Sequence, residues 1–373
     1  MARFGKRNKI KVDPLSYNFA LIGESGAGKS TVIKEYCEKL AGDEGYLFLE
    51  IGKEDGHDAI NGIVYETVED WDKLTEVVDD IIDNRTTDYK DLKVVVFDTL
   101  DELFAIAEPE VLRMHNRENP TKTTKSINSA FGGFQAGQDK AIEIVLDILW
   151  SLKKVGISFI VIGHTKTRNV TDAVTGEDYM QLTTNLPQKY FNAIKTKVHI
   201  LGTLSIDREI AKEKTGKKNI VTKKDIEKGV VKAETRKITF RDDNFVIDSK
   251  SRFADIVESI PLDSDALIKA ITDAIKVELA KDGTNFNDAT VEQAKANETE
   301  FKRLAQQEVE NKKADELAAV LEEIKTCVAK HKTNPENLGK IMEKSNELNY
   351  ANPMAIDNIE DAKALITYMN TLK

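Results

Sequence analysis

Residues 21–31 read LIGESGAGKST, and positions 23–30 within this stretch match the pattern G-x-x-x-x-G-K-[ST]. The preceding residues, 17–22, form an apolar run suited to a buried strand, and residues 31–40 are predicted to form a helix. A strand, a glycine-rich loop and a helix in this order are the context that a phosphate-binding P-loop requires. A chance glycine turn seldom matches both the pattern and its context, so the stretch predicts a P-loop.

Each part of this loop suits the binding of a nucleoside triphosphate. Glycines allow backbone N–H groups to turn toward phosphate oxygens, and the positive end of the following helix attracts the same anions. Lys29 is expected to reach the β- and γ-phosphates, and the hydroxyl of Ser30 is expected to bind Mg²⁺. The sequence therefore predicts a site for ATP and Mg²⁺. The residues predicted to bind the nucleotide are Gly23, Glu24, Ser25, Gly26, Ala27, Gly28, Lys29, Ser30 and Thr31.

Composition and charge limit the class of protein. The 373 residues suit two domains, and 40% hydrophobic with 32% charged residues is typical of a soluble globular chain. A net charge of −10 argues against a protein that covers its whole surface with nucleic acid, but it leaves room for a local basic channel. No apolar run is long enough to span a membrane. Cys37 and Cys327 show no metal-like or disulfide-like spacing, so a reducing cytoplasm is expected.

Apolar runs alternate with helical patterns along the first two thirds of the chain. Continuous apolar runs are typical of parallel strands buried on both faces. The alternation predicts an α/β fold with a mainly parallel sheet flanked by helices. Polar stretches at 115–138 and 166–189 interrupt the pattern and are predicted to be long loops. The predicted strands are 17–22, 46–51, 92–97, 157–162 and 197–203, and the predicted helices are 31–40, 71–82 and 141–155.

Three regions are predicted from the change in composition along the chain. Residues 1–16 form a short basic arm, residues 17–261 the α/β domain, and residues 262–373 a helical C-terminal region. Residues 237–240 and 245–247 are predicted to pair as a hairpin. The helical region is expected either to pack on itself as a small bundle or to dock a partner. Its predicted helices are 263–281, 288–312 and 314–330, followed by two short helices within 338–373.

A second nucleotide motif is predicted at residues 94–98, where an apolar strand ends in an acidic residue. The carboxylate of Asp98 is expected to hold Mg²⁺ directly or through water. AAA+ and ABC ATPases usually place a catalytic glutamate immediately after this aspartate, whereas Thr99 occupies that position here. RecA-like proteins take the glutamate from the end of the second strand, which here offers both Glu50 and Glu54. Either glutamate is a candidate for positioning the attacking water.

The order of these motifs over residues 17–260 resembles the RecA/RadA class, and most closely the RecA-like recombination ATPases that phages encode. Residues 159–165, FIVIGHT, resemble the strand whose polar end senses the γ-phosphate, with His164 in place of the glutamine of RecA. Lys250 and Arg252 resemble residues that reach the nucleotide of a neighbouring subunit. The resemblance implies a RecA-like P-loop NTPase fold with an AAA-type nucleotide-binding domain, Mg-dependent ATPase activity, a homo-oligomer, and the cytoplasm of a bacterial host.

The two polar stretches lie where the RecA-like class keeps its DNA-binding loops, so the resemblance implies single-stranded DNA as a partner. Cations that follow the backbone and aromatic rings that stack on bases are the usual means of binding a single strand. Residues 212–237 add the largest local excess of lysine. The aromatic rings can instead pack beneath their loops, and the lysines can simply face solvent. The candidates are Arg117, Lys122, Lys125, Phe131 and Phe134 in the first loop and Lys166, Arg168, Tyr179, Lys189 and Tyr190 in the second.

The sequence thus predicts an ATP-dependent, single-stranded DNA-binding ATPase of phage recombination, annealing or repair. Two alternatives stay open: a replication loader or helicase-like motor that acts through protein partners, and a non-catalytic nucleotide switch. The C-terminal helices are a candidate docking region for a single-strand binding protein. The predicted catalytic residues are Lys29, Glu54, Glu50, His164, Lys250 and Arg252, and the predicted metal ligands are Ser30 and Asp98.

Overall fold

The computed structural model describes residues 9–171, 175–218, 225–241, 250–332 and 334–372. The chain divides into two compact units, residues 1–296 and residues 297–373. We call the first the α/β unit and the second the helical unit. The first eight residues of the predicted basic arm lie outside the described residues.

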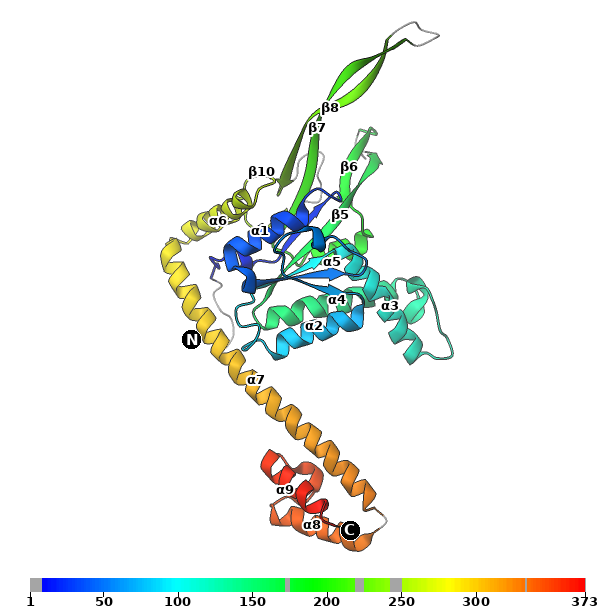
Figure 1. The fold of residues 1–373 in the computed structure, drawn as a ribbon, viewed down its shortest axis with the longest axis vertical. Helices are drawn as coiled ribbons and strands as arrows, with labels where there is room; N and C mark the ends of the chain where they lie inside the picture. The colour runs from blue at the N-terminus through cyan, green and yellow to red at the C-terminus, as the bar shows by residue number, and fades with distance from the viewer. Residues whose placement is uncertain (1–8, 172–174, 219–224, 242–249, 333, 373) are drawn as a thin grey trace. The chain divides into compact units, whose positions relative to one another are not determined.

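The α/β unit is built on a twisted sheet whose strand order is β10-β8-β7-β1-β5-β4-β2-β3, with β6 paired to β5 and β9 paired to β7. Its strands β5, β6, β7, β8 and β10 are labelled in Figure 1. Within the row of six strands from β7 to β3, each adjacent pair is parallel, which confirms the predicted mainly parallel sheet. The strands are β1 (Phe19–Gly23), β2 (Tyr46–Ile51), β3 (Tyr65–Val68), β4 (Val94–Asp98), β5 (Ser158–Thr171), β6 (Asp178–Thr184), β7 (Ile200–Lys218), β8 (Asp225–Thr239), β9 (Lys250–Ser251) and β10 (Ser259–Pro261).

Helices cover both faces of this sheet, because successive side chains of a strand point to opposite faces and both faces are apolar. In β1, Ala20 and Ile22 join a core with α2, α3, α4 and α5, whereas Phe19 and Leu21 join a second core with α1 and α6. The RecA-like α/β class expected from the sequence is therefore the observed fold. The helices of this unit are α1 (Lys29–Ala41), α2 (Trp71–Asp83), α3 (Leu100–Glu118), α4 (Ala136–Lys154), α5 (Gln188–Lys195) and α6 (Ser264–Lys281).

The boundary between compact units falls later than the composition change at residue 261. Helix α6 buries Leu267, Ile271 and Ile275 in the second core of the sheet, so it belongs to the α/β unit. Residues 288–312 and 314–330, predicted as two helices, form one continuous helix, α7 (Phe286–Lys330). The prediction of two helices is wrong because residue 313 is a lysine within a run of good helix formers, and nothing there ends a helix.

The helical unit has a small core of its own. Residues of the last part of α7 pack with α8 (Pro335–Glu347) and α9 (Ile359–Met369) around Ile324, Ile341 and Leu365, all fully or almost fully buried. This is the self-packed bundle that the sequence left open as one of two alternatives. Among the described residues, no helix combines the length and the apolar character needed to cross a membrane.

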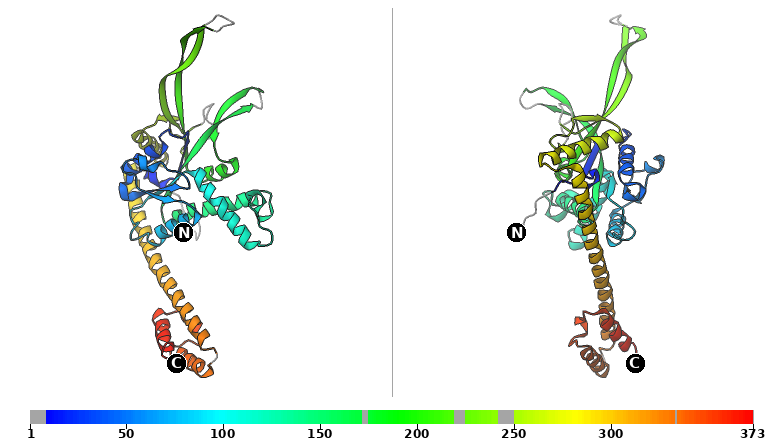
Figure 2. Two further views of the ribbon diagram at one scale, coloured as in Figure 1. Left: turned by 45° about the vertical axis from the view of Figure 1, so that its right-hand side comes forward. Right: turned by 90° about the vertical axis from the view of Figure 1, so that its left-hand side faces the viewer.

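Two strands of the sheet extend far past its edge and turn back as hairpins (Figures 1 and 2). Strand β5 continues to Thr171 and pairs antiparallel with β6, and strand β7 continues to Lys218 and pairs antiparallel with β8. The stretch 166–189, predicted as a loop, is therefore mostly a hairpin followed by α5. Residues 237–239, predicted to form a hairpin with residues 245–247, pair with β7 on one side and with β10 on the other. Residues 245–247 lie outside the described part of the chain.

Tyr190, a candidate for stacking on a DNA base, lies in α5 beneath the second polar stretch. Its ring stacks on Phe104 of α3 with centroids 4.3 Å apart, and its hydroxyl donates to Glu108 at 2.6 Å. Only 2% of the residue is exposed. Tyr190 thus follows the alternative that the aromatic residues pack beneath their loops.

We therefore expect Tyr190→Ala to lower the free energy of unfolding by about 3–5 kcal/mol, the usual cost of deleting a buried aromatic ring. Tyr190→Phe keeps the stacked ring and loses only the hydrogen bond to Glu108, so its cost is about 1 kcal/mol. Urea unfolding followed by circular dichroism measures both values. Equal losses for the two variants would contradict the burial of this ring.

Candidate functional site

The P-loop lies at the carboxyl edge of the sheet, between the end of β1 and the start of α1. Gly26 and Gly28 have φ values of 70° and 100°, which side chains other than glycine rarely adopt. The ammonium group of Lys29 donates to the carbonyl oxygens of Gly23 at 3.0 Å and Glu24 at 2.9 Å. Burial lowers the pKa of Lys29, while nearby carboxylates, Asp98 first, oppose the shift. The cation of Lys29 is thus held against the loop's own carbonyl groups, in the loop that the sequence pattern predicts to bind phosphate.

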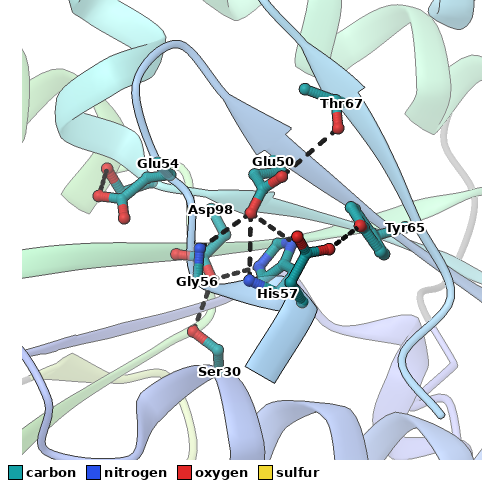
Figure 3. A network of polar contacts seen from close by, with 10 residues as sticks. Ser30, Glu50, Glu54, Gly56, His57, Tyr65, Thr67 and Asp98 are labelled. Atoms are coloured by element: carbon teal, nitrogen blue, oxygen red, sulfur yellow. Dashed lines mark hydrogen bonds and ion pairs between the residues drawn. The ribbon is translucent and has the colours of Figure 1, made fainter. Parts of the chain in front are cut away.

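The two predicted metal ligands meet at this edge. The hydroxyl of Ser30 donates to Oδ2 of Asp98 at 2.6 Å, which joins the start of α1 to the end of β4 (Figure 3). Both side chains offer the hard oxygen atoms that Mg²⁺ prefers. Their closeness and chemistry fit a Mg²⁺ ion held by Ser30 and Asp98. The ion would neutralise charge on the β- and γ-phosphate oxygens.

His57 is a site residue that the sequence analysis missed. It lies at the start of η3 (His57–Ala59), only 3% exposed, and its Nε2 is 3.0 Å from the same Oδ2 of Asp98 that Ser30 contacts. Its Nδ1 is buried without a hydrogen-bond partner, 3.7 Å from Glu50 (Figure 3). A histidine beside a metal-binding carboxylate fixes the orientation of that carboxylate. The only sequence signal was its place just after β2, in the segment that follows Glu50 and contains Glu54.

The structure gives Glu50 and Glu54 different environments. Glu50 is buried, and its Oε1 accepts hydrogen bonds from the backbone N–H groups of Gly56 and His57, each at 3.1 Å. Glu50 therefore holds the turn after β2. Glu54 lies 3.4 Å from the hydroxyl of Thr99, next to Asp98 and apart from the Glu50 carboxylate (Figure 3). Burial, and then the charge of Asp98, raise the pKa of Glu54.

His164 lies at the same edge, paired in register with Gly23 of β1. Its backbone N–H donates to Oδ2 of Asp101 at 2.9 Å, and its ring Nδ1 is 3.4 Å from that oxygen. Burial alone would raise the pKa of Asp101, but hydrogen bonds, mainly from His164, outweigh it and lower the pKa. The sensor candidate is thus tied to the first turn of α3 and lies where β5 leaves the sheet.

Lys250 and Arg252 lie at the opposite, amino edge of the sheet. Strand β9 pairs with Ile200 and Leu201 of β7, at the level where β1 begins. Lys250 donates to the carbonyl of Lys195 at 2.7 Å, and Arg252 donates to the carbonyl of Thr196 at 3.3 Å. The structure therefore does not bring these two residues to the P-loop of their own chain. A role at a nucleotide stays a prediction that requires a neighbouring subunit.

A group of cations surrounds His199 at this amino edge. The Nδ1 atom of His199 accepts a hydrogen bond from the backbone N–H of Asn18 at 3.0 Å. Burial, and then the charges of Lys153, Arg252 and Lys250, lower the pKa of His199 to about 4. The imidazole is therefore neutral at pH 7 in the folded chain.

This lowered pKa predicts a loss of stability in acid. Below pH 6.5 the unfolded chain takes up a proton at His199 that the folded chain resists down to about pH 4, so protonation favours unfolding. We expect His199 to contribute roughly 2 kcal/mol to the fall in unfolding free energy across that window. The difference between wild type and His199→Gln, measured by urea unfolding from pH 7 to pH 4, isolates this contribution. Parallel pH profiles for the two proteins would contradict it.

The P-loop, the adjoining Ser30–Asp98 contact and the parallel sheet together define a P-loop nucleotide-binding ATPase of RecA-like fold. A family model described as an AAA domain matches residues 16–256, and the chain belongs to this family. Among solved structures, the KaiC-like protein PH0186 from the hyperthermophilic archaeon Pyrococcus horikoshii OT3 is similar at 13% identity and a TM-score of 0.31, over 66% of this chain and 84% of that chain. A comparison with curated proteins found no match.

The two glutamates can be separated experimentally. We expect Glu54→Gln to lower the rate of ATP turnover by about 100-fold or more while nucleotide binding persists, because a positioning carboxylate acts mainly in the transition state. Glu50→Gln should instead lower stability by about 1–3 kcal/mol, since it weakens a buried acceptor of two N–H groups. Turnover, nucleotide affinity and urea unfolding of both variants give the test. Full turnover in Glu54→Gln would exclude it as the water-positioning residue.

Proposed function

We propose that the chain is a Mg-dependent ATPase that binds single-stranded DNA and acts in phage DNA recombination, annealing or repair. The observation that carries the proposal is the course of β5 and β7. These two strands flank the P-loop strand β1 on either side, and both continue past the nucleotide edge into hairpins. The strands on both sides of the P-loop strand thus continue into the hairpins, so we expect a shift of the nucleotide edge to reach the roots of both hairpins.

The charges of the two hairpins favour one of them for DNA. Residues 205–237, which contain the β7–β8 hairpin, carry eleven lysines and arginines against six acidic residues. Residues 165–184, which contain the β5–β6 hairpin, carry two basic residues against three acidic ones. An excess of positive charge in a chain of net charge −10 concentrates binding of a polyanion at that place. The β7–β8 hairpin is the part of the chain that suits contact with the DNA backbone.

A candidate stacking surface lies between α3 and α4. Phe134 is fully exposed and has a φ of 49°, whereas Phe131 packs edge-on against His115. Lys122 and Lys125 are also exposed in this connection. An exposed aromatic ring near lysines can stack on a base while the lysines contact phosphates. Of the two phenylalanines predicted in this loop, Phe134 is therefore the stronger candidate.

The chemistry follows from the residues at the carboxyl edge. The P-loop and Lys29 hold the phosphates, Ser30 and Asp98 hold Mg²⁺, and Glu54 orients the attacking water. The pKa of Glu54 is raised toward neutral pH, which makes its carboxylate a better proton acceptor and suits a group that polarises water. We expect loss of the γ-phosphate to change the contacts of His164, and the β5–β6 hairpin begins immediately after this residue.

Assembly is part of the proposal. Lys250 and Arg252 face away from their own P-loop, so they serve catalysis only if a homo-oligomer brings the amino edge of one subunit to the nucleotide of the next. An arginine supplied across such an interface stabilises charge on the transferred phosphoryl group. The helical unit, which holds no residue of the nucleotide site, is a candidate docking region for a single-strand binding protein.

The central test is ATP turnover with and without a single-stranded oligonucleotide, with Lys29→Ala as the inactive reference. We expect the oligonucleotide to stimulate turnover several-fold, and we expect Lys232→Glu, on the exposed part of β8, to weaken DNA binding about tenfold, since each phosphate contact carries a salt-dependent share of affinity. Lys154→Glu makes the same charge change at the end of α4 and should leave DNA binding unchanged.

Other outcomes favour the alternatives. Turnover that is indifferent to DNA but stimulated by a helicase or primase would overturn the DNA proposal in favour of a loader or motor that works through proteins. Nucleotide binding with no turnover under any condition would favour a nucleotide switch.

A further inference from the structure

The root of the β7–β8 hairpin contacts the P-loop directly. Nη1 of Arg236, on β8, donates to the carbonyl oxygen of Ala27 at 3.1 Å. The same nitrogen lies 3.7 Å from the position that a Cβ atom would occupy on Gly28. The guanidinium group is thus against the turn of the loop whose N–H groups receive phosphate. None of the nucleotide motifs in the sequence includes this arginine.

Arg236 belongs to a small charged network that joins the hairpin to the loop. Its Nη2 is 3.2 Å from the carboxylate of Glu234, which also lies 3.3 Å from Nε of Arg208 on β7. Arg208 in turn lies 3.8 Å from the carboxylate of Glu24 within the P-loop. Two arginines of the hairpin therefore alternate with one carboxylate of the hairpin and one of the loop. We call these four residues the root network.

Fold stability alone is a weak reason for this network. The side chains of Arg236 and Arg208 are 41% and 42% exposed, and ion pairs at such positions stabilise a fold by less than about 1 kcal/mol. A guanidinium group is, however, well suited to phosphate, because its planar N–H groups make paired hydrogen bonds to two oxygens. The network places two such groups beside the loop.

We propose that Arg236 is a nucleotide-binding residue contributed by the β7–β8 hairpin, and that Glu234 occupies it when no nucleotide is bound. A triphosphate in the P-loop brings several negative charges close to the guanidinium group and competes with the single charge of Glu234. When Arg236 turns to phosphate, Glu234 loses one of its two arginine partners. The hairpin root then rearranges with nucleotide, so the hairpin responds to the occupancy of the site.

The two members of the network predict opposite effects on affinity. Arg236→Ala should weaken binding of a non-hydrolysable ATP analogue about tenfold, the size expected for one charge-assisted hydrogen bond, and Arg236→Lys should restore part of the loss. Glu234→Gln should tighten binding, because it removes the competitor. If Arg236 only stabilised the hairpin, Glu234→Gln would weaken its ion pair with Arg236, loosen the hairpin root and weaken nucleotide binding.

The experiment is titration calorimetry of the full chain with the analogue and Mg²⁺, combined with hydrogen exchange of residues 225–239 with and without analogue. Arg241→Ala is the matched control, since Arg241 lies five residues after Arg236, beyond Thr239 at the end of β8, where the chain runs toward the amino edge of the sheet. We expect nucleotide to change exchange in β8 of the wild type and of Arg241→Ala, but not of Arg236→Ala. Wild-type affinity in Arg236→Ala, or weaker binding in Glu234→Gln, would overturn the proposal.

This inference does not depend on DNA. Calorimetry and hydrogen exchange are both measured without nucleic acid and without ATP turnover. Their results can therefore be interpreted even if DNA does not stimulate turnover. Conversely, if DNA stimulates turnover but Arg236→Ala binds the ATP analogue as tightly as the wild type, only the proposed role of Arg236 is excluded.

Discussion

The hydrogen bond from Ser30 to Asp98 is the contact on which the rest of the site depends. It joins the first turn of α1 to the end of β4, although β5 separates β1 from β4 in the sheet. The two side chains can meet because β1, β5 and β4 are parallel, so that β1 and β4 end at the same edge of the sheet. His57 adds a second group to the same oxygen of Asp98, so this carboxylate is held from the helix and from the turn after β2. The parallel pairing of the strands, more than any single residue, thus brings the polar side chains of the site together at one edge of the sheet.

Much of this arrangement could be predicted because its determinants are local. Buried parallel strands read as apolar runs, and β4, VVVFD, is buried along its whole length. The P-loop pattern is local as well. The sequence alone could not distinguish the environments of Glu50 and Glu54, because these depend on a contact formed by folding: the backbone N–H of Gly56 donates to the Glu50 carboxylate. His57 was missed for the same reason: its contact with Asp98 joins residues 41 positions apart, and no spacing rule marks it.

The β5–β6 hairpin was predicted as a loop, and the strand now seen as β7 was predicted to end at residue 203, for a different physical reason. A strand that lies on a core alternates apolar and polar residues, whereas a strand pair with solvent on both faces needs only its backbone hydrogen bonds. Beyond the sheet, β5 reads TKTRNVT and the outer part of β7 is rich in charge, so neither carries the usual alternation. Tyr190 shows the converse, because a ring within a polar stretch proved to be core. In the hairpins, therefore, a polar sequence correctly indicated contact with solvent, but it did not mean that the stretch lacks secondary structure.

Strand β7 runs without a break from Ile200, at the amino edge, to Lys218, fourteen residues past its pairing with Gly23 at Leu204. At about 3.3 Å per residue, the part beyond Leu204 reaches roughly 45 Å. Because the ribbon is this long, a tilt of about 5° at its root would displace Lys218 by about 4 Å. The register shift between Glu209 and Ile210 lies close to the fulcrum, so bending there would absorb part of the motion before it reached the far end. The stiffness of the ribbon at its register shifts, between Glu209 and Ile210 and between Lys214 and Lys218, thus sets how much of a tilt at the root reaches Lys218.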